Sequence, residues 1–587
     1  MNKIKFSNCS CEILPGNFDI NKIPLNCDAT WRLISSGFTT GIFQLETHLG
    51  MEWAKKVQPN SIEELAALIS ILRPGPLESG QADEYVDIKF GKKQPSYLHP
   101  LLKSILEPTY SSLIYQEQSL KIAADLAGFS LEESDTLRKG LGKKDTKIIA
   151  ELKNKFINGC IKNKKISKET AEQIFGWIQK GQRYLFNRSH AVAYAMLGYQ
   201  TGYMKTHFPR EFFTSQLTYS QYKADSKDEI YKLVQDARLF GIDIYPPDIR
   251  HRNTHFEIVN NPNEGIRFGL AHIRNVGQSA IEKITDSQDL SSWNKFLKAV
   301  PALHRNVGIA LIQSGACDYY NISRSQMIYE LEIILGKTLI HENGKKKNGN
   351  GLTEKERDWF FTNLKDNKTV KDTLELMLIA CENASPRLSI VKKDDLINIA
   401  RKFLAANKWD DNIFSKNTKP EIIDLLLKHG YKENIEKKPC SNKNRIEELK
   451  KKIEQLNSTK EDTNTGKAIA EKYFLGISLS CSPADDADSS QASHTCLDVA
   501  KALNGQNISV CAIIDNVKFT KTKKGKKPGS KMCFVTISDS TYSISYAVIF
   551  PDAFEELKQF CYQDYICMFY GTKKNGSFII SNIKKLI

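Results

Sequence analysis

The spacing of apolar residues changes near Ile508, and this change divides the sequence into a helical part and a β-rich part. In residues 61–213 apolar side chains recur every three or four positions, which is typical of amphipathic helices. From Ile508 onward the runs VCAIID, CFVTISD and SISYAVIF alternate instead, and a helical segment, AFEELKQF, follows them. Short strands with one helix predict a small β-barrel behind a mostly helical, multidomain chain.

Two helices can be placed from their end signals. Ser130 lies three residues before Glu133, so a capping box predicts a short helix over about residues 131–139. A second helix is predicted to begin at Ser167 and to stop at Gly181. Its buried face is expected to consist of Ala171, Ile174, Phe175 and Ile178.

The middle of the chain is less regular. Residues 241–284 are punctuated by Gly269, Val276 and Gly277, and we interpret them as a helix-hairpin-helix. Residues 326–471 are charged and rich in Asn and Lys, which predicts a variable insertion, much of it mobile. One heptad-like helix within it is marked by Ile446, Leu449, Ile453 and Leu456.

The composition favours a polyanionic partner and a reducing compartment. Lys and Arg number 83 against 68 Asp and Glu, which gives a formal net charge of +15. The 13 cysteines form no facing CxxC motifs, which predicts reduced thiols and no structural zinc. Apolar runs such as residues 376–381 are too short to cross a bilayer, so we expect a soluble, cytoplasmic protein with no membrane partner.

Several separate strings together resemble one family. They are GIFQLETHLGM from Gly41, LRPGPLESG from Leu72, LIYQEQSLKIAADLAGFS from Leu113, LRKGLGKK from Leu137, FNRSHAVAYAMLGYQTGYMKTHFPREFF from Phe186, GLAHIRNVG from Gly269, LGISLS from Leu475, and the barrel from Ile508. The chain resembles the alpha subunit of bacterial DNA polymerase III, the C-family replicative polymerase, in which such strings occur in this order. The resemblance spans nearly the whole chain apart from the insertion.

The resemblance implies an order of domains. Residues 1–225 are expected to form the fingers, with the palm–fingers junction at their start. Residues 226–325 are expected to hold duplex DNA through the helix-hairpin-helix, and residues 326–474 form the charged, partly helical insertion on the clamp side. Residues 475–587 are then an OB-fold domain near the single-stranded template. The expected fold class is multidomain and mostly α, with a C-terminal all-β OB-fold barrel.

One cluster of cations suits the triphosphate of an incoming nucleotide, which needs fixed positive charge around it. The cluster lies at a predicted helix C-terminus and in the Gly140/Gly142 turn after it. By resemblance its nucleotide-binding residues are Arg138, Lys139, Lys143 and Lys144, with Lys139 and Gly140 in place of the more usual Arg and Ala. The alternative is that these cations only complement the helix dipole.

A second candidate nucleotide site is the polar segment before the next apolar helix. It consists of Asn187, Arg188, Ser189 and His190, with Arg188 where the family more often has Lys. By resemblance it binds the nucleotide or the primer end, while Asn187 and Ser189 could instead be helix caps. Arg73 in LRPGPL is interpreted either as a phosphate clamp or as a hinge cation.

Two further sets of residues are expected to contact DNA. In the hairpin, the resemblance implies Gly269, Arg274, Val276 and Gly277. In the barrel, one strand-to-strand loop and its flanks carry Lys518, Phe519, Lys521, Lys523, Lys524, Lys526, Lys527 and Lys531. Cationic loops with aromatic side chains are how OB-folds hold single strands. The alternative is a solvated hairpin tip, and Phe534 is expected in the barrel core.

Two-metal nucleotidyl transfer needs carboxylates that hold two magnesium ions. The palm strings of the family, PDxDxDF-like and DFLGL-like, do not occur in the sequence, so the metal ligands are expected outside this chain. We therefore interpret the chain as one piece of a split DNA-directed DNA polymerase. Its expected partners are primer–template DNA, single-stranded template, dNTPs and a polypeptide that bears the palm and the PHP-like domain.

Other interpretations stay open. The chain could be a non-catalytic DNA-binding accessory protein derived from a polymerase that lost its palm. A metal-dependent nuclease or a clamp adaptor finds no supporting motif, and no QxxLF-like peptide occurs, so binding to a sliding clamp stays an open question. Asn8-Cys9 also has the residue order of a downstream intein junction.

Overall fold

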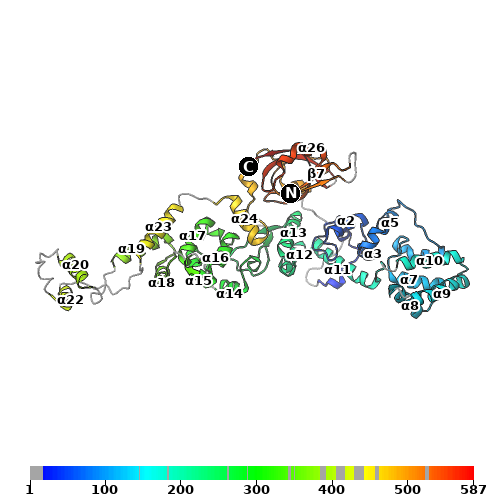
Figure 1. The fold of residues 1–587 in the computed structure, drawn as a ribbon, viewed down its shortest axis with the longest axis horizontal. Helices are drawn as coiled ribbons and strands as arrows, with labels where there is room; N and C mark the ends of the chain where they lie inside the picture. Colours follow the sequence, from blue (N-terminus) through cyan, green and yellow to red (C-terminus); the bar gives the residue numbers. More distant parts are fainter. Residues whose placement is uncertain are drawn as a thin grey trace. The chain divides into compact units, whose positions relative to one another are not determined.

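The computed structural model describes residues 18–143, 146–181, 184–260, 264–286, 289–336, 338–340, 346–348, 351–383, 392–404, 417–428, 442–456, 462–522, 528–574 and 576–587. The chain forms two compact units, shown as a ribbon in Figure 1. The first unit holds residues up to 245 together with 256–267 and 489–587, and the second holds 246–255 and 268–488. The division into four segments therefore stays a prediction, and Asn8-Cys9 lies outside the described residues.

The first unit begins with a long series of helices and short 3-10 turns. They are η1 (Ile20–Lys22), α1 (Asp28–Ser35), α2 (His48–Val57), α3 (Ile62–Ile71), α4 (Pro74–Glu78), α5 (Gln81–Lys89), η2 (Pro100–Leu102), α6 (Lys103–Leu106), η3 (Glu107–Thr109), α7 (Gln116–Ala127), α8 (Leu131–Lys143), α9 (Thr146–Lys164), α10 (Lys168–Gly181), α11 (Arg188–His207), α12 (Pro209–Tyr219), η4 (Ser220–Tyr222) and α13 (Ser226–Leu239).

Helices α7 to α10 share one hydrophobic core. Phe156 of α9 and Phe175 of α10 are fully buried there, with ring centroids 5.6 Å apart. The predicted face of α10 is the buried one, because its core residues are Ala171, Ile174, Phe175 and Ile178. The capping box before α8 is also confirmed: the Glu133 amide donates to Ser130 Oγ at 3.2 Å and the Ser130 amide donates to Glu133 Oε2 at 3.1 Å.

Two sheets complete the first unit. The first sheet has the order β1-β3-β2, formed by β1 (Asp243–Tyr245), β2 (Glu257–Val259) and β3 (Gly265–Arg267), with β1 parallel to β3. The second is a closed barrel of order β10-β8-β7-β6-β9. Its elements, after α25 (Cys496–Lys501), are β6 (Asn507–Lys521), β7 (Lys531–Ser538), β8 (Ser543–Ile549), α26 (Pro551–Leu557), η10 (Lys558–Phe560), β9 (Ile566–Lys574) and β10 (Ser577–Lys585).

Every second side chain along the strands points into the barrel and fills its core. On β7 the inward residues are Cys533, Val535 and Ile537, and Phe554 and Leu557 of α26 join the same core. The expectation that Phe534 lies in this core is wrong, because Phe534 is half-buried and occupies the opposite phase of the strand. Five strands that close around one core, with a helix between the third and fourth, confirm the predicted OB-fold barrel.

The second unit is mainly helical. It comprises η5 (Leu270–His272), α14 (Gln278–Asp286), α15 (Trp293–Leu303), α16 (Arg305–Gln313), η6 (Asp318–Tyr320), α17 (Arg324–Leu335), β4 (Thr338–Ile340), β5 (Lys346–Asn348), α18 (Glu354–Asn363), α19 (Val370–Asn383), α20 (Lys393–Leu404), α22 (Lys419–Lys428), α23 (Lys443–Leu456), α24 (Asn464–Leu475) and η9 (Pro483–Asp486). The heptad-like helix is α23, whose Ile446, Leu449 and Ile453 are buried. None of the described helices in either unit is long and apolar enough to cross a bilayer.

Candidate functional site

Three of the sequence motifs meet at one place in the first unit. The segment that begins at Leu113 and the segment that begins at Phe186 form an isolated parallel bridge between Tyr115 and Phe186. In this bridge the Phe186 amide donates to the Ile114 carbonyl at 2.8 Å, and the Gln116 amide donates to the Phe186 carbonyl at 2.9 Å. Residues that are 71 positions apart are thereby fixed side by side at the starts of α7 and α11.

Arg73, from the third motif, contacts the same segment. Its guanidinium lies over the Phe186 ring, 4.6 Å from the centroid, and donates to the carbonyls of Ser70 and Tyr184. Partial burial lowers the pKa of Arg73, and the backbone contacts compensate the charge. A Cβ on Gly75 would overlap the ring of Tyr184, so any other residue at this position of LRPGPL would require that ring to move. These contacts tie Arg73 to the segment before α11, and both interpretations of Arg73, phosphate clamp and hinge cation, stay predictions.

The polar segment lies at the N-terminus of α11. Asn187 is the N-cap residue, and its Oδ1 accepts a hydrogen bond from the His190 amide at 2.8 Å. Arg188, Ser189 and His190 form the first turn of the helix itself, and all three are exposed. The helix-cap alternative is therefore confirmed for Asn187. The first turn of a 20-residue helix also carries partial positive charge, which suits an anion.

Glu117 holds this turn in place; it lies within the string that begins at Leu113, but it was not among the expected site residues. Its carboxylate accepts one hydrogen bond from Asn187 Nδ2 at 2.9 Å and another from the Arg188 amide at 2.9 Å. A cavity of about 270 Å³ lies beside it, lined in part by Tyr115, Lys121 and Arg188. Burial raises the pKa of Tyr115 to about 12, so its hydroxyl stays protonated at neutral pH. The lining therefore combines the cations Lys121 and Arg188 with the carboxylates Glu63 and Glu117.

The second cation cluster lies on α8, and its expected geometry needs a correction. The helix continues to Lys143, so Gly140 and Gly142 are helical residues and form no turn. A Cβ at Gly140 would lie 2.9 Å from Ile148 Cγ2 of α9, so glycine allows the end of α8 to pack closely on α9. The sequence pattern missed this because glycine is usually a helix stop, and packing overrode that preference here.

Arg138 and Lys139 share one carboxylate. Asp135 lies 2.8 Å from Arg138 Nη2 and 2.7 Å from Lys139 Nζ. Hydrogen bonds from Lys139 and Arg138 lower the pKa of Asp135. Among the described side chains, no hydrogen bond or ion pair joins this cluster to the α11 turn. Lys144 and the side chain of Lys143 lie outside the described residues.

The hairpin residues occupy different positions in the second unit. The first expected helical piece is only the 3-10 turn η5, preceded by Gly269, and the second piece is α14. Val276 is buried, so it supports the turn from inside, whereas Gly277 is exposed. The exposed Arg274 lies 4.3 Å from the ring centroid of Tyr473, and its amide donates to the Phe474 carbonyl at 2.9 Å. The turn is thereby tied to α24.

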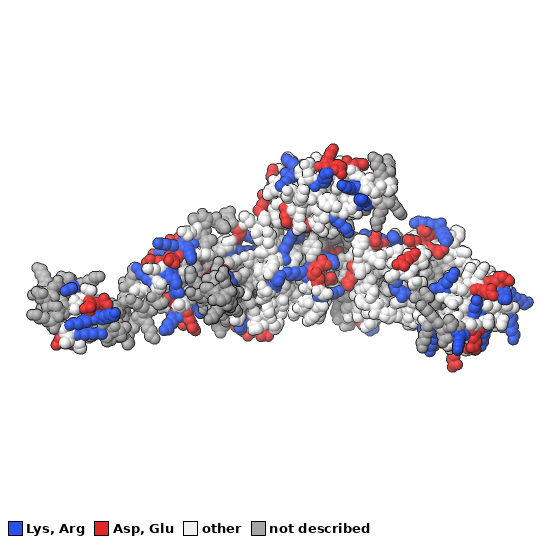
Figure 2. Space-filling view, viewed as in Figure 1, with Lys and Arg blue, Asp and Glu red and all other residues white. Residues whose placement is uncertain are grey.

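In the barrel, the described cations lie on two paired strands. Lys518 and Lys521 are exposed near the end of β6, and Lys531 is exposed at the start of β7. Lys523, Lys524, Lys526 and Lys527 lie outside the described residues. Phe519 is 59% exposed, so it is available for stacking. On the face shown in Figure 2, basic and acidic side chains are interspersed, so the net charge alone does not locate a DNA surface.

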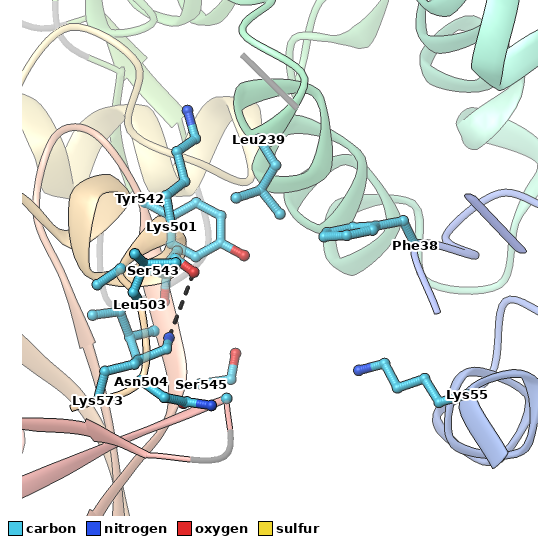
Figure 3. A pocket seen from close by; sticks show the side chains of 14 residues that line it. Phe38, Lys55, Leu239, Lys501, Leu503, Asn504, Tyr542, Ser543, Ser545 and Lys573 are labelled. Carbon is cyan, nitrogen blue, oxygen red and sulfur yellow. Dashed lines mark hydrogen bonds between the residues drawn. The ribbon is translucent and has the colours of Figure 1, made fainter. Parts of the chain in front are cut away.

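A larger cavity of about 800 Å³ lies within the first unit (Figure 3). Lys55 of α2, Lys501 of α25 and Lys573 of β9 line it. Lys573 links β9 to α25, because its Nζ donates to the Val499 carbonyl at 3.0 Å, and burial lowers the pKa of Lys573. Among the described residues, no group of three His, Cys, Asp or Glu side chains is arranged to hold a metal ion.

Comparison with known proteins agrees with these features. Residues 8–164 match the family model of the bacterial DNA polymerase III alpha subunit finger domain, and residues 241–327 match a helix-hairpin-helix motif. The chain thus contains one segment similar to the finger domain of that polymerase subunit and one similar to a helix-hairpin-helix motif. Specifically, it is related to the alpha subunit of bacterial DNA polymerase III.

Curated relatives named DNA polymerase III subunit alpha cover about half of the chain. The Aquifex aeolicus protein is 37% identical over 318 residues, which are 53% of this chain and 27% of that protein. The Escherichia coli K12 protein is 35% identical over 324 residues, with the same shares of 53% and 27%. The Helicobacter pylori protein is 33% identical over 351 residues, 57% of this chain and 29% of that protein. The chain thus matches little more than a quarter of the length of these relatives.

Proposed function

We propose that this chain supplies nucleotide and primer–template binding to a replicative DNA-directed DNA polymerase whose palm is carried by another polypeptide. The observation that carries the proposal is the Tyr115–Phe186 bridge, which brings three motif segments together. It leaves Arg188, Ser189 and His190 exposed in the first turn of α11. Such a group of donors and positive charge suits phosphate oxygens.

Within this proposal the residues have distinct roles. The α11 turn, with Asn187 as its cap, holds the triphosphate or the primer end. Arg138, Lys139, Lys143 and Lys144 add positive charge around the phosphates. Phosphoryl transfer depends mainly on positioning and on stabilisation of negative charge, so a chain can contribute strongly to the reaction without any metal ligand of its own.

Two magnesium ions would complete the reaction centre. They would be held by palm carboxylates that the 587 residues do not include in the family's usual strings, and they would activate the primer hydroxyl and stabilise the leaving oxygen. The metal-binding part of the site is therefore assigned to the partner, in the bacterial or phage-infected cytoplasm.

DNA binding is assigned to two parts of the chain. Arg274 and the exposed Gly277 backbone in the hairpin suit duplex phosphates, because backbone amides and an arginine can contact them without reading sequence. The barrel, with Lys518, Phe519, Lys521 and Lys531, suits the single-stranded template. A sliding clamp stays an open partner.

A reconstitution experiment tests the proposal. The purified chain should bind a fluorescent primer–template, measured by anisotropy, and incorporate no nucleotide at any magnesium concentration. A palm-bearing polypeptide, identified by co-purification from the native source and mass spectrometry, should restore template-directed synthesis. Robust polymerisation by the chain alone would overturn the split arrangement. DNA binding without restored synthesis would favour the non-catalytic accessory protein instead.

A further inference from the structure

A separate cavity is lined by residues of the barrel and by none of the α11 turn. Its volume is about 680 Å³, and its walls come from the end of β6, the start of β7, α26 and the residues after α26. The residues that matter here are Phe519, Lys521, Lys531, Phe554, Lys558 and Tyr562. Three of them, Phe554, Lys558 and Tyr562, belong to the helical side of the barrel, where the sequence pattern pointed to no binding residue.

Two aromatic side chains of this cavity are unusually exposed. Phe519 is 59% exposed and Tyr562 is 57% exposed. Phe519 is also held in place, because its ring makes an edge contact with the buried Phe554, with centroids 6.0 Å apart at 83°. Large aromatic surfaces left in water at a concave site are typical of a site that a flat apolar partner covers.

The charges that line the cavity have one sign. Lys521 and Lys531 are direct register partners on β6 and β7. Like charges directly opposite each other on a sheet repel, so this pairing weakens the barrel unless an anion lies between them. Lys558 adds a third cation; its carboxylate partner Glu555, 2.5 Å away, also interacts with Lys531 but is not among the residues that line the cavity. The lining therefore combines exposed aromatic rings with positive charge.

From this combination we propose that the cavity binds one nucleotide of single-stranded DNA. The base stacks against Phe519 and Tyr562, while the phosphates on either side contact Lys521, Lys531 and Lys558. Base stacking on aromatic residues tolerates any sequence, as a template-binding site requires. The proposal rests on the assignment of the single-stranded template to the barrel, and it extends that site from the strands to α26 and Tyr562.

The test uses the full chain and two oligonucleotides of equal length and charge. One is fluorescein-labelled oligodeoxythymidylate of about 12 nucleotides, within the site size typical of an OB-fold, and the other has abasic residues in place of the thymidines. Phe519→Ala and Tyr562→Ala should each weaken binding of the thymidylate about 10-fold and barely change binding of the abasic strand. Both residues are exposed, so these variants should fold normally.

Matched controls separate stacking from charge. Phe550→Ala removes a 42% exposed ring in the same barrel that does not line the cavity, and it should change neither affinity. Lys558→Gln should weaken the binding of both oligonucleotides equally. The proposal would be overturned if Phe519→Ala weakened binding of both strands equally or weakened neither. It would also be overturned if an acidic peptide containing Phe displaced the thymidylate at a lower concentration than the unlabelled strand does.

A duplex primer–template measured in parallel keeps this proposal distinct from the proposed function. If wild-type chain binds duplex but not thymidylate, the nucleotide site is overturned and the polymerase assignment stands. If the chain binds thymidylate with the expected variant pattern but binds no duplex, the polymerase assignment fails and the nucleotide site stands.

Discussion

Lys205 and Asp236 form an ion pair in the interior of the first unit, with Nζ and Oδ2 2.5 Å apart and side chains 0% and 7% exposed. Lys205 Nζ also donates to the carbonyls of Phe38 and Thr40, each at 2.8 Å. Burial lowers the pKa of Lys205, while the pairing with Asp236 opposes that change. One ammonium group thereby joins α11, α13 and the loop before α2.

Removing one partner of this pair should be costly. Asp236→Ala leaves a buried ammonium without its counter-charge, and we expect the free energy of unfolding to fall by about 3–5 kcal/mol. The double variant Lys205→Met/Asp236→Leu should lose much less, because no unpaired charge remains. Urea unfolding of the three proteins measures this, and a loss below about 1 kcal/mol for Asp236→Ala would contradict the buried-pair account.

Glu117 should matter for the nucleotide through its support of the α11 turn. Glu117→Ala removes the carboxylate that accepts hydrogen bonds from Asn187 Nδ2 and from the Arg188 backbone amide. The first turn of α11 then loses its support. In the reconstituted polymerase we expect KM for dNTP to rise about 5- to 10-fold with a smaller change in kcat. Glu172→Ala, at an exposed position on α10, is the matched control. Unchanged kinetics with intact folding would remove Glu117 from the site.

Arg138 is expected to act directly on the phosphates. Arg138→Ala should raise KM for dNTP or lower kcat at least about 10-fold in the reconstituted enzyme, equivalent to roughly 1.4 kcal/mol of transition-state stabilisation. Lys162→Ala, an exposed cation on α9, should have little effect. If both variants behave alike, Arg138 serves only its ion pair with Asp135.

The lysines at the end of β6 and in the segment between β6 and β7 should set the salt dependence of single-strand binding. Replacing Lys521, Lys523, Lys524, Lys526 and Lys527 by Ser should weaken binding and flatten the plot of log affinity against log salt, by about 0.7 for each phosphate that is no longer neutralised. Titrations at several salt concentrations measure the slope. A slope that stays unchanged would show that the loop is only a solvated tip.

His272 gives the second unit a pH dependence. Burial, with a smaller effect from His255, lowers the pKa of His272 from 6.5 to about 4. At a pH between these two pKa values, the imidazole is protonated in the unfolded chain but not in the folded chain. The free energy of unfolding is therefore at its full value above about pH 6.5 and decreases as the pH drops toward 4. The loss should be about 1–3 kcal/mol.

Urea unfolding at pH 7 and pH 5 checks this dependence. His272→Asn should reduce the difference in stability between the two pH values. His251→Asn, at an exposed histidine of the same unit, should leave most of the difference in place. Equal pH dependence in wild type and His272→Asn would contradict the assignment.

The sequence predicted features that depend on local spacing. The Ser130 capping box, the buried face of α10, the helix of Ile446 and the closed barrel all follow from periodicity and end signals, and all are present. Features set by tertiary contacts were not predictable in this way. The extension of α8 past Gly140 depends on Ile148 of another helix, and the outward position of Phe534 depends on the phase of β7 against its neighbours.

The site shows the same contrast. Family strings located the α11 turn, and one of them also contains Glu117, but nothing in its charge or spacing showed that this carboxylate would contact a turn on a different helix. The strands β1 and β3 were missed as well, because three-residue strands are too short to show alternation and depend on pairing with distant residues.

The bridge between Tyr115 and Phe186 has a topological consequence. The chain enters the α7–α10 bundle at Tyr115 and leaves it at Phe186, so the entry and exit of about 70 residues are adjacent. An excursion of this kind has the connectivity of a module inserted into a host fold. The inserted bundle is not self-contained, because Ile105 and Leu106 of α6 pack into the same core, so replacing the bundle by a tight turn would expose apolar side chains of the host helices to water.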